Sequence, residues 1–448
     1  MHFVGHRPCS VGGGRIPTQL IDLHTPVDRV VLVGAPERSM RRDLVDEHLE
    51  ELGRLTDTAG GDVVGTLVQR IDAPHPRFYI GEGKARELAE LVEDREADLV
   101  VFDEELSPAQ GKNLEEVVGV RVMDRSELIL DIFATRAKSK EARMQVELAQ
   151  LQYLLPRLRR MWSHLSRIRG GIGLRGPGET QLETDRRLIG TRISDLRSKL
   201  KDVAKARAIQ RKGRRGSFRV ALVGYTNAGK SSLLRALSGS ELFVEDRLFA
   251  TLDSATRSVD LGSGYEALLT DTVGFIRKLP HHLVASFRST LEEAREADVL
   301  LHVIDAAHPD WEEHHQVVTE VLEELGLEDR NQILVFNKVD RITHEEEGML
   351  RERIRALDST PSVFVSAVDP ETLDALRQTL LTRVRGSMAR VVVTIPVADG
   401  EAIATVYREG EVVDRRDERL SVRLNARIPA ELVGRLNGRK DVTVQEVA

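Results

Sequence analysis

A glycine-rich segment in the middle of the chain has the residue types and spacing of a phosphate-binding loop. It follows the apolar run RVALV and precedes a helix-forming run. Glycines let backbone N–H groups curl around a phosphate, while the following helix directs its positive end at it. A lysine at its end would bridge the outer phosphates, and the next hydroxyl suits Mg²⁺. These residues are candidates for binding a nucleoside triphosphate with magnesium: Gly224, Tyr225, Thr226, Asn227, Ala228, Gly229, Lys230 and Ser231.

A second motif follows the apolar run ALLT and consists of Asp271, Thr272, Val273 and Gly274. A carboxylate in this place reaches Mg²⁺ through water, and the glycine N–H approaches the γ-phosphate. An isolated Asp-x-x-Gly is otherwise a common turn. The motif indicates a nucleotide site only because it follows the glycine-rich segment in the order that a triphosphate site requires.

Two further motifs predict that the bound base is guanine. The Asp340 carboxylate, after the run QILVF, can accept hydrogen bonds from N1–H and the 2-amino group of guanine. Adenine has an acceptor at N1 and no 2-amino group, so the mismatch costs on the order of several kcal/mol. The motif comprises Asn337, Lys338, Val339 and Asp340. Backbone N–H groups for the guanine carbonyl would come from the segment after SVFV, namely Ser366, Ala367 and Val368.

A threonine between the first two motifs is expected to close onto the γ-phosphate and Mg²⁺ as the second protein oxygen. Both Thr251 and Thr256 fit that description. The segment around the first of them, a further candidate for nucleotide contact, is Phe249, Ala250, Thr251, Leu252 and Asp253.

The position after Gly274 lacks the water-orienting glutamine of many regulatory GTPases, since Phe275 and Ile276 stand there. A phenyl ring cannot orient water by hydrogen bonding. We therefore predict slow unassisted hydrolysis that accelerates when a large partner orders this segment. The alternative is that Phe275 only packs and another group holds the water.

Composition limits the class of protein. The 448 residues include 41% apolar and 31% charged residues and a single cysteine, Cys9, so no internal disulfide can form. No run of eighteen apolar residues exists, and residues 1–27 lack the features of a secretory signal and are expected to be a disordered extension. We expect a cytoplasmic protein without an integral membrane segment.

The strands and helices that the sequence predicts around the motifs fall into three domains. Apolar β-branched runs alternate with amphipathic stretches over 28–130, which predicts a small parallel α/β domain. Residues 218–385 would form a doubly wound domain around the nucleotide motifs. Residues 389–448 predict a small α+β domain without chemistry of its own. Within 28–130 the polar residues that invite a metal or acid/base role are expected to be solvated loop residues: His75, Asp103, Glu104 and Glu105.

Residues 131–215 predict a basic helical hairpin. Residues 136–219 hold 23 Lys or Arg against 7 Asp or Glu, although the whole chain carries a net charge of −7, so a phosphate-rich partner is indicated. Between the arms lies the glycine-rich loop 170–183, flanked by Arg169 and Arg175; it is either a plain connector or a phosphate-contacting tip. An apolar stripe at helical spacing is formed by Leu148, Leu151, Leu155 and Leu158.

Together the motifs resemble the HflX family of translational P-loop GTPases. The resemblance rests on GYTNAGKSSL at 224–233, LFATLD at 248–253, DTVGFIRKLP at 271–280, NKVD at 337–340 and GGIGLRGPGETQLE at 170–183. It implies a GTPase that binds the large ribosomal subunit and its ribosomal RNA and splits or rescues ribosomes, often under stress. An alternative is a GTP-switched ribosome-assembly or RNA-binding factor. The free protein is expected to be a monomer that exchanges GTP and GDP.

The same resemblance favours Thr251 over Thr256. It implies that Ser231 and Thr251 are the Mg²⁺ ligands and that 249–253 contact GTP. The residues expected to act in hydrolysis are then Lys230, Thr251 and Gly274. One departure from the family is Ser254, where many members have proline.

Overall fold

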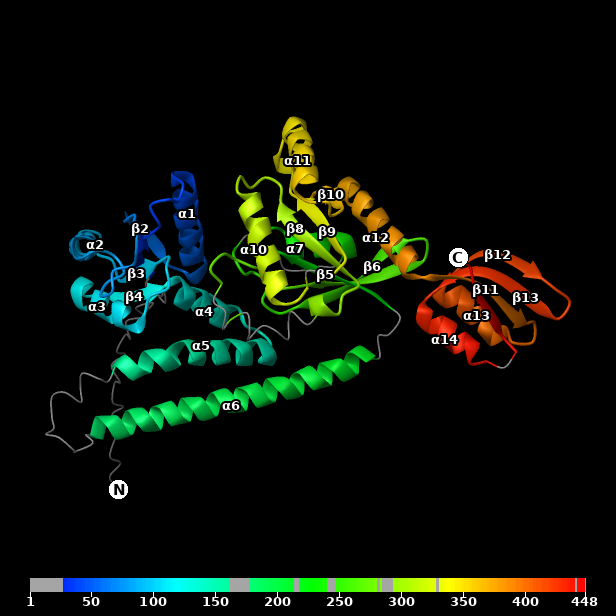
Figure 1. The fold of residues 1–448 in the computed structure, drawn as a ribbon, viewed down its shortest axis with the longest axis horizontal. Coiled ribbons are helices and arrows are strands. Elements are labelled where there is room, and N and C mark those ends of the chain that lie inside the picture. Colours follow the sequence, from blue (N-terminus) through cyan, green and yellow to red (C-terminus); the bar gives the residue numbers. More distant parts are fainter. Residues whose placement is uncertain are drawn as a thin grey trace, which may run out of the picture.

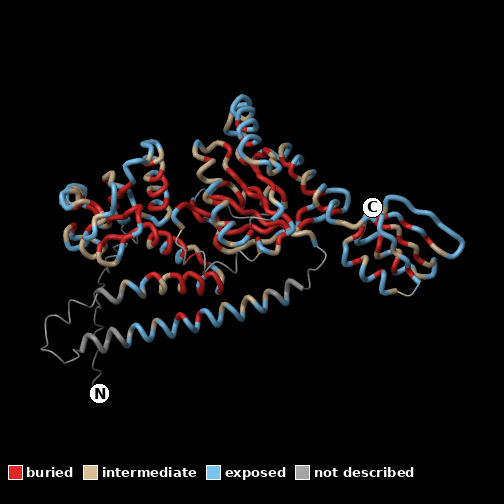
Figure 2. The backbone as a smooth tube through the Cα atoms, in the orientation of Figure 1, coloured by how far each residue is buried: buried red, intermediate tan, exposed pale blue. Residues whose placement is uncertain are grey.

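The computed structural model describes residues 27–161, 177–212, 217–239, 247–279, 283, 293–327, 330–439 and 441–447. Three sheets follow one another along the chain, and a pair of long helices runs beneath the first two (Figure 1). Buried residues lie in the strands, on helices that pack against the sheets and along the upper of the two long helices (Figure 2). None of the described helices is both long and apolar enough to cross a bilayer.

The first sheet is parallel, as the alternation of strands and helices predicts. Its order is β2-β1-β3-β4, formed by β1 (Arg29–Gly34), β2 (Asp62–Val68), β3 (Leu99–Phe102) and β4 (Arg121–Asp124). The connecting helices are α1 (Arg42–Ala59), α2 (Glu82–Asp94), α3 (Pro108–Val118) and α4 (Arg125–Arg136). The central strands are almost completely buried because helices cover both faces.

The expectation that the acidic residues after β3 are solvated is wrong for two of them. Asp103 is 3% exposed and Glu104 is 8% exposed. Charged groups this deeply buried need partners. The partners come from other parts of the chain: Arg125 follows β4, and Arg277 and Lys278 belong to the second domain. Only Glu105 of the three carboxylates is exposed.

Two long helices form the expected hairpin. The helices α5 (Lys140–Met161) and α6 (Pro177–Lys212) lie side by side, and their seam includes Leu148, Leu151 and Leu155. Residues 177–183, expected in the loop, instead begin α6. Pro177 is followed by helix formers, and a helix tolerates proline in its first turn because that N–H has no intrahelical partner. Residues 170–176, with Arg169 and Arg175, lie outside the described residues, as does the predicted extension except residue 27.

The second sheet is six-stranded with the order β10-β9-β8-β5-β7-β6, antiparallel only at β6. Its strands are β5 (Phe218–Gly224), β6 (Ala255–Gly262), β7 (Tyr265–Asp271), β8 (Val299–Asp305), β9 (Gln332–Asn337) and β10 (Ser362–Phe364). The α-helices described here are α7 (Lys230–Ser238), α10 (Trp311–Glu324), α11 (His344–Leu357) and α12 (Leu373–Ser387), and short 3₁₀ turns lie at Val339–Arg341 and Pro370–Thr372. The doubly wound prediction is confirmed.

The third sheet is antiparallel, with the order β12-β13-β11-β14. Its strands are β11 (Ala389–Pro396), β12 (Glu411–Asp417), β13 (Ser421–Ile428) and β14 (Thr443–Glu446), and two helices, α13 (Gly400–Glu409) and α14 (Ala430–Asn437), pack on it. The prediction of a small α+β domain from the sequence is confirmed. β14 is a short strand with little apolar character.

Candidate nucleotide site

The predicted motifs meet at the carboxyl edge of the second sheet. Gly224 ends β5, Asp271 ends β7, Asn337 ends β9, and Ser366 follows β10. In open α/β sheets this edge is where ligands bind. A cavity of about 270 Å³ lies there, and its walls include both Lys230 and Gly274.

Two glycines of the loop are required by its geometry. Gly224 has a φ of 152°, and a Cβ there would stand 2.2 Å from the carbonyl oxygen of Val303. Gly229 has a φ of 93°, and its Cβ would stand 2.2 Å from Nδ2 of Asn337. The loop therefore curls against β8 and β9 only without side chains at these positions.

The Lys230 ammonium is buried under the loop. Its Nζ donates to the carbonyl oxygens of Gly224 at 3.0 Å and Tyr225 at 2.8 Å. Burial lowers the pKa of Lys230 to about 8, and the Asp271 carboxylate opposes the shift. An anionic ligand beside this ammonium would favour its charged form.

This pKa predicts that GTP binding becomes pH dependent in alkaline solution. A bound triphosphate raises the pKa of Lys230 above 8, so between that value and the higher bound value the complex takes up a proton. Affinity is therefore constant below pH 7 and falls as pH rises above 8, by up to about tenfold per unit. Calorimetry at pH 9 in two buffers of different ionisation enthalpy should show close to one proton taken up, and at pH 7 none. No buffer dependence at pH 9 would contradict this.

Oxygen atoms suited to a magnesium ion are gathered beside the loop. The Ser231 and Thr251 hydroxyls are 2.7 Å apart, and Oγ of Ser231 donates to Oδ2 of Asp271 at 2.5 Å. The other carboxylate oxygen of Asp271 is buried without a hydrogen-bond partner among the described residues. Thr256 lies in β6 and bonds the hydroxyl of Thr270 instead. The donor set fits Mg²⁺, which prefers a few hard oxygen ligands.

The motifs that are predicted to bind the base are joined by side-chain hydrogen bonds. Nδ2 of Asn337 donates to the carbonyl oxygen of Ala228 at 2.9 Å, and Oδ1 accepts the N–H of Ala367 at 3.1 Å. Oγ of Ser366 donates to Oδ1 of the exposed Asp340. Asp340 is thus oriented on one side and open on the other. Val368 exposes its side chain to solvent, so only its backbone can take part.

Lys338 and the segments 249–253 and 271–277, which we call the two switch-like segments, lie beside the glycine-rich loop. Nζ of Lys338 donates to the carbonyl oxygen of Asn227 at 2.9 Å. The Phe249 N–H donates to Oγ1 of Thr226 at 2.9 Å, and Thr272 donates its hydroxyl to the carbonyl oxygen of Leu222 at 2.7 Å. Of the other predicted residues, Leu252 and Val273 are buried, Ala250 lines the cavity and Val339 opens the 3₁₀ turn that contains Asp340.

Asp253 and Gly274 each contact a different part of the structure. The Asp253 carboxylate faces the start of α5, where it accepts the N–H of Ser139 at 3.1 Å. Gly274 lies against the loop, since a Cβ there would be 2.8 Å from Cα of Thr226 and 3.0 Å from Nζ of Lys230.

Four polar residues that are not among the predicted site residues also line the cavity. They are Ser232, Arg235, Arg247 and Arg341. Ser232 and Arg341 directly follow two of the motifs, so adjacency is a usable signal for them. For Arg235 and Arg247 the sequence offers only one signal, a basic side chain not far from the loop in the chain.

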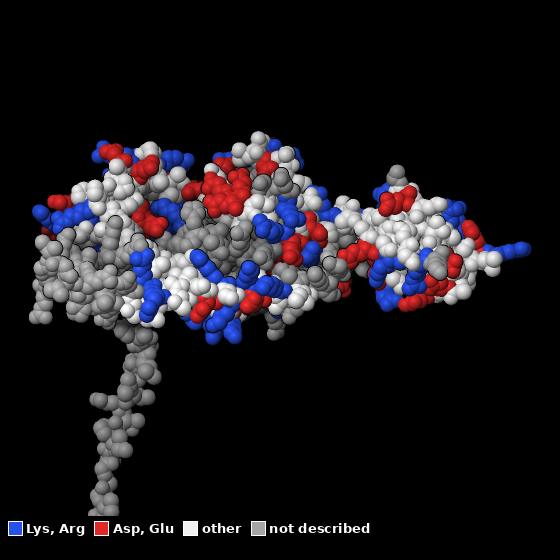
Figure 3. Space-filling model, turned by 60° about the horizontal axis from the view of Figure 1, so that its bottom comes forward, with Lys and Arg blue, Asp and Glu red and all other residues white. Residues whose placement is uncertain are grey.

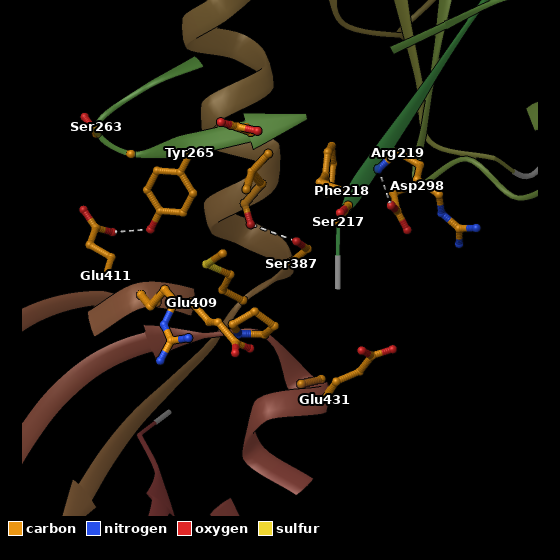
Figure 4. Close-up of a pocket in the computed structure, with 18 of the residues that line it drawn as sticks. Ser217, Phe218, Arg219, Ser263, Tyr265, Asp298, Ser387, Glu409, Glu411 and Glu431 are labelled. Carbon is orange, nitrogen blue, oxygen red and sulfur yellow. Dashed lines mark hydrogen bonds between the residues drawn. The ribbon is translucent and has the colours of Figure 1, made fainter. Parts of the chain in front are cut away.

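A larger cavity lies elsewhere, between the second and third sheets. It has a volume of about 940 Å³ and is lined by residues such as Arg219, Tyr265 and Glu411 (Figure 4). The Tyr265 hydroxyl donates to Glu411 at 2.8 Å across it. None of the nucleotide motifs reaches this space, so size does not mark the functional site here.

Comparison with known proteins agrees with the motifs. Three families match consecutive parts: "GTP-binding GTPase N-terminal" over residues 46–134, "GTP-binding GTPase Middle Region" over 136–214 and "50S ribosome-binding GTPase" over 219–338. A crystal structure of a GTP-binding protein from the hyperthermophilic archaeon Sulfolobus solfataricus with GDP is 25% identical, covering 80% of this chain and 99% of that one, with a TM-score of 0.43.

Curated relatives are similar along most of the chain. GTPase HflX of Magnetococcus marinus is 44% identical over 95% of this chain and 99% of its own length. GTPase HflX of Escherichia coli is 44% identical over 86% of this chain and 90% of its own. The chain therefore belongs to the HflX family of GTPases, and it hydrolyses GTP.

Proposed function

We propose that this GTPase binds the large ribosomal subunit through its helical hairpin, that binding accelerates GTP hydrolysis, and that the cycle splits or rescues ribosomes in the cytoplasm. The observation that carries the proposal is the hydrogen bonding of Asp253, next to the nucleotide site, to the first residues of the hairpin. One of the matching families is described as a 50S ribosome-binding GTPase, which supports the choice of partner.

The exposed face of α6 has the charge that ribosomal RNA requires. Lys and Arg line the hairpin in the view that brings it forward (Figure 3). Phosphates neutralised by such side chains release counterions, which gives binding that weakens with salt. The exposed basic residues of α6 include Arg186, Arg187, Arg192, Arg197, Lys199, Lys201 and Lys205.

Contacts of Asp253 connect this hairpin to the site. Its carboxylate accepts the N–H groups of Lys138 and Ser139 at 3.2 and 3.1 Å, and the Ser139 hydroxyl also donates to it. Asp253 is two residues from Thr251, which lies beside Ser231. A shift of α5 on docking would therefore move the threonine proposed to hold the metal.

We assign the chemistry of the site as follows. Lys230 and the backbone N–H groups of the loop hold the phosphates, Ser231 and Thr251 supply oxygens to Mg²⁺, and the Gly274 N–H meets the γ-phosphate. A magnesium ion held by these two oxygens would neutralise charge that develops on the phosphates. Asp340 selects guanine. Phe275 is 1% exposed and cannot orient water, so unassisted turnover should stay well below the roughly 5–20 s⁻¹ of GTPases with a bound activator.

Charge reversal on α6 tests the partner. The variant carrying Arg186→Glu, Arg187→Glu, Arg197→Glu and Lys201→Glu should retain its unassisted GTP turnover, because none of these residues lines the cavity. Stimulation by large ribosomal subunits should fall at least about tenfold, since several phosphate contacts are lost. Turnover is measured with and without purified subunits at two salt concentrations.

A matched control places two reversals on β12, Arg415→Glu and Arg416→Glu, which are exposed on the third sheet. This control should be stimulated normally. Equal stimulation of the α6 variant and the control would refute the role of the hairpin. Splitting of 70S particles with a non-hydrolysable GTP analogue then separates a splitting factor from a timer, and binding only to precursor subunits would instead indicate an assembly factor.

A further inference from the structure

The first domain reaches the nucleotide site through a buried polar network. Two of its carboxylates, Glu51 on α1 and Asp103 after β3, are each 3% exposed. The Arg125 guanidinium, 1% exposed, joins them from within the same domain: it donates to Asp103 at 3.0 Å and pairs with Glu51. The first domain thus holds two buried carboxylates against one internal cation.

The second cation comes from the other domain. Arg277, three residues after Gly274, donates from both terminal nitrogens to Asp103 at 3.1 and 2.9 Å, and its Nε lies 2.9 Å from Glu51. It also donates to the carbonyl oxygen of His48 at 3.0 Å. A forked pair of this kind fixes orientation as well as distance. Together with Lys278, whose Nζ lies 2.7 Å from Asp103, Arg277 supplies the network with cations of the second domain, so the network is complete only when the two domains are in contact.

The same network grips the phosphate-binding loop through Tyr225. The Tyr225 hydroxyl donates to Glu51 and accepts the backbone N–H of Arg277 at 3.0 Å. Main-chain bonds add to this: Phe275 donates to the carbonyl oxygen of Gly224 at 3.1 Å, and Thr226 donates to that of Phe275. Two kinds of contact therefore hold the segment that contains Gly274 against the loop. One is backbone hydrogen bonding, and the other runs through the carboxylates of the first domain.

We propose that Glu51 is a positioning residue for GTP hydrolysis: through Tyr225 and Arg277 it holds residues 274–277 against the loop, and so sets where the Gly274 N–H meets the γ-phosphate. Asp103 acts with it on Arg277. Neither carboxylate, nor Arg277, lines the nucleotide cavity. Displacing a reacting group by about 1 Å can cost on the order of a hundredfold in rate. The expected loss is accordingly in kcat and not in nucleotide affinity.

The substitution Glu51→Gln tests this, because it keeps the size of the side chain and removes its charge. In the full-length protein, kcat for GTP should fall about 10- to 100-fold, while KM and the affinity for GDP change less than about threefold. Glu51→Asp keeps the charge and should retain kcat within about fivefold. The matched control is Glu50→Gln, at an exposed position on the same helix, with an expected kcat equal to that of the parent protein.

Tyr225→Phe removes only the hydroxyl and keeps the ring, which stacks on His314 at 3.7 Å. Combined with Glu51→Gln it should cost less than the product of the two single effects, since both act through one contact. The proposal is overturned by a Glu51→Gln enzyme with kcat within twofold of the parent. It is also overturned if kcat and GDP affinity fall together and Glu51→Asp restores neither, because that pattern reports a loosened fold.

Discussion

Lys230→Ala should lower kcat for GTP hydrolysis on the order of a thousandfold or more. The Lys230 side chain is buried under the loop, where its Nζ donates hydrogen bonds to two backbone carbonyl oxygens. Charge that develops on the transferred phosphoryl group is stabilised most by preorganised donors in a site without water, and one neutral donor alone contributes about 10²- to 10³-fold.

Single-turnover hydrolysis and GTP affinity are the two measurements required. Affinity should fall as well, because we expect the lysine to contact the phosphates in the ground state too. Lys230→Met fills the same space without charge and should behave like the alanine variant, which separates loss of charge from a cavity. Lys84→Ala, on α2 of the first domain, is the control and should match the parent protein. Turnover within tenfold of the parent in both Lys230 variants would contradict the assignment.

The sequence predicts well which motifs meet at one edge of the second sheet, because the signal is local. Gly224 and Gly229 occupy backbone conformations that other residues rarely adopt, so the fold requires glycine there. Asp271 and Asn337 end apolar strands, and parallel strands bring their carboxyl ends to one edge whatever connects them. Order along the chain and strand direction together bring these motifs to one edge without any knowledge of side-chain contacts.

The contacts between domains could not be predicted in the same way. Asp103 reads as a loop residue after a strand, and its partner Arg277 lies 174 positions away. Asp253 reads as part of the nucleotide contact, and the structure turns its carboxylate toward Ser139, 114 positions away. No periodicity or spacing links such pairs. A buried charge is identified only once the surface that covers it is known.

Helix boundaries failed for a different reason. A run of glycines predicts a loop at 170–183, but the helical tendency of Glu-Thr-Gln-Leu-Glu after Pro177 prevails over Gly178. One glycine in a helix costs about 1 kcal/mol relative to alanine, which neighbouring residues and packing offset. Glycine near a helix start is therefore weaker as a loop signal than glycine in the middle of a polar run.

One of the two switch-like segments contacts the hairpin, and the other contacts the first domain. Asp253 meets the start of α5, and Arg277 meets Glu51 and Asp103. A partner that moves the first domain would thus act on residues on both sides of the γ-phosphate position. We expect this arrangement to give a physical route from a docked hairpin to hydrolysis at a site that has no water-orienting side chain after Gly274.

Asp340→Asn should change the base that the site accepts. The carboxylate can take two charge-assisted hydrogen bonds from guanine, each contributing about 1.5–3 kcal/mol, so GTP affinity should fall about 10²- to 10⁴-fold. Xanthine carries an acceptor in place of the 2-amino group, and the asparagine amide can donate to it while its oxygen accepts N1–H. The variant should therefore bind xanthosine triphosphate more tightly than GTP.

Competition calorimetry with guanosine, xanthosine and adenosine triphosphates measures this reversal. Oγ of Ser366 orients the side chain at position 340 and can donate to the amide oxygen as it does to the carboxylate, so the geometry should survive the exchange. Asp374→Asn, at an exposed position on α12, is the matched control and should keep its preference for GTP. Unchanged GTP affinity in Asp340→Asn would place base selection elsewhere. A loss of GTP without a gain of xanthosine triphosphate would mean that the carboxylate orders this edge and does not contact the base.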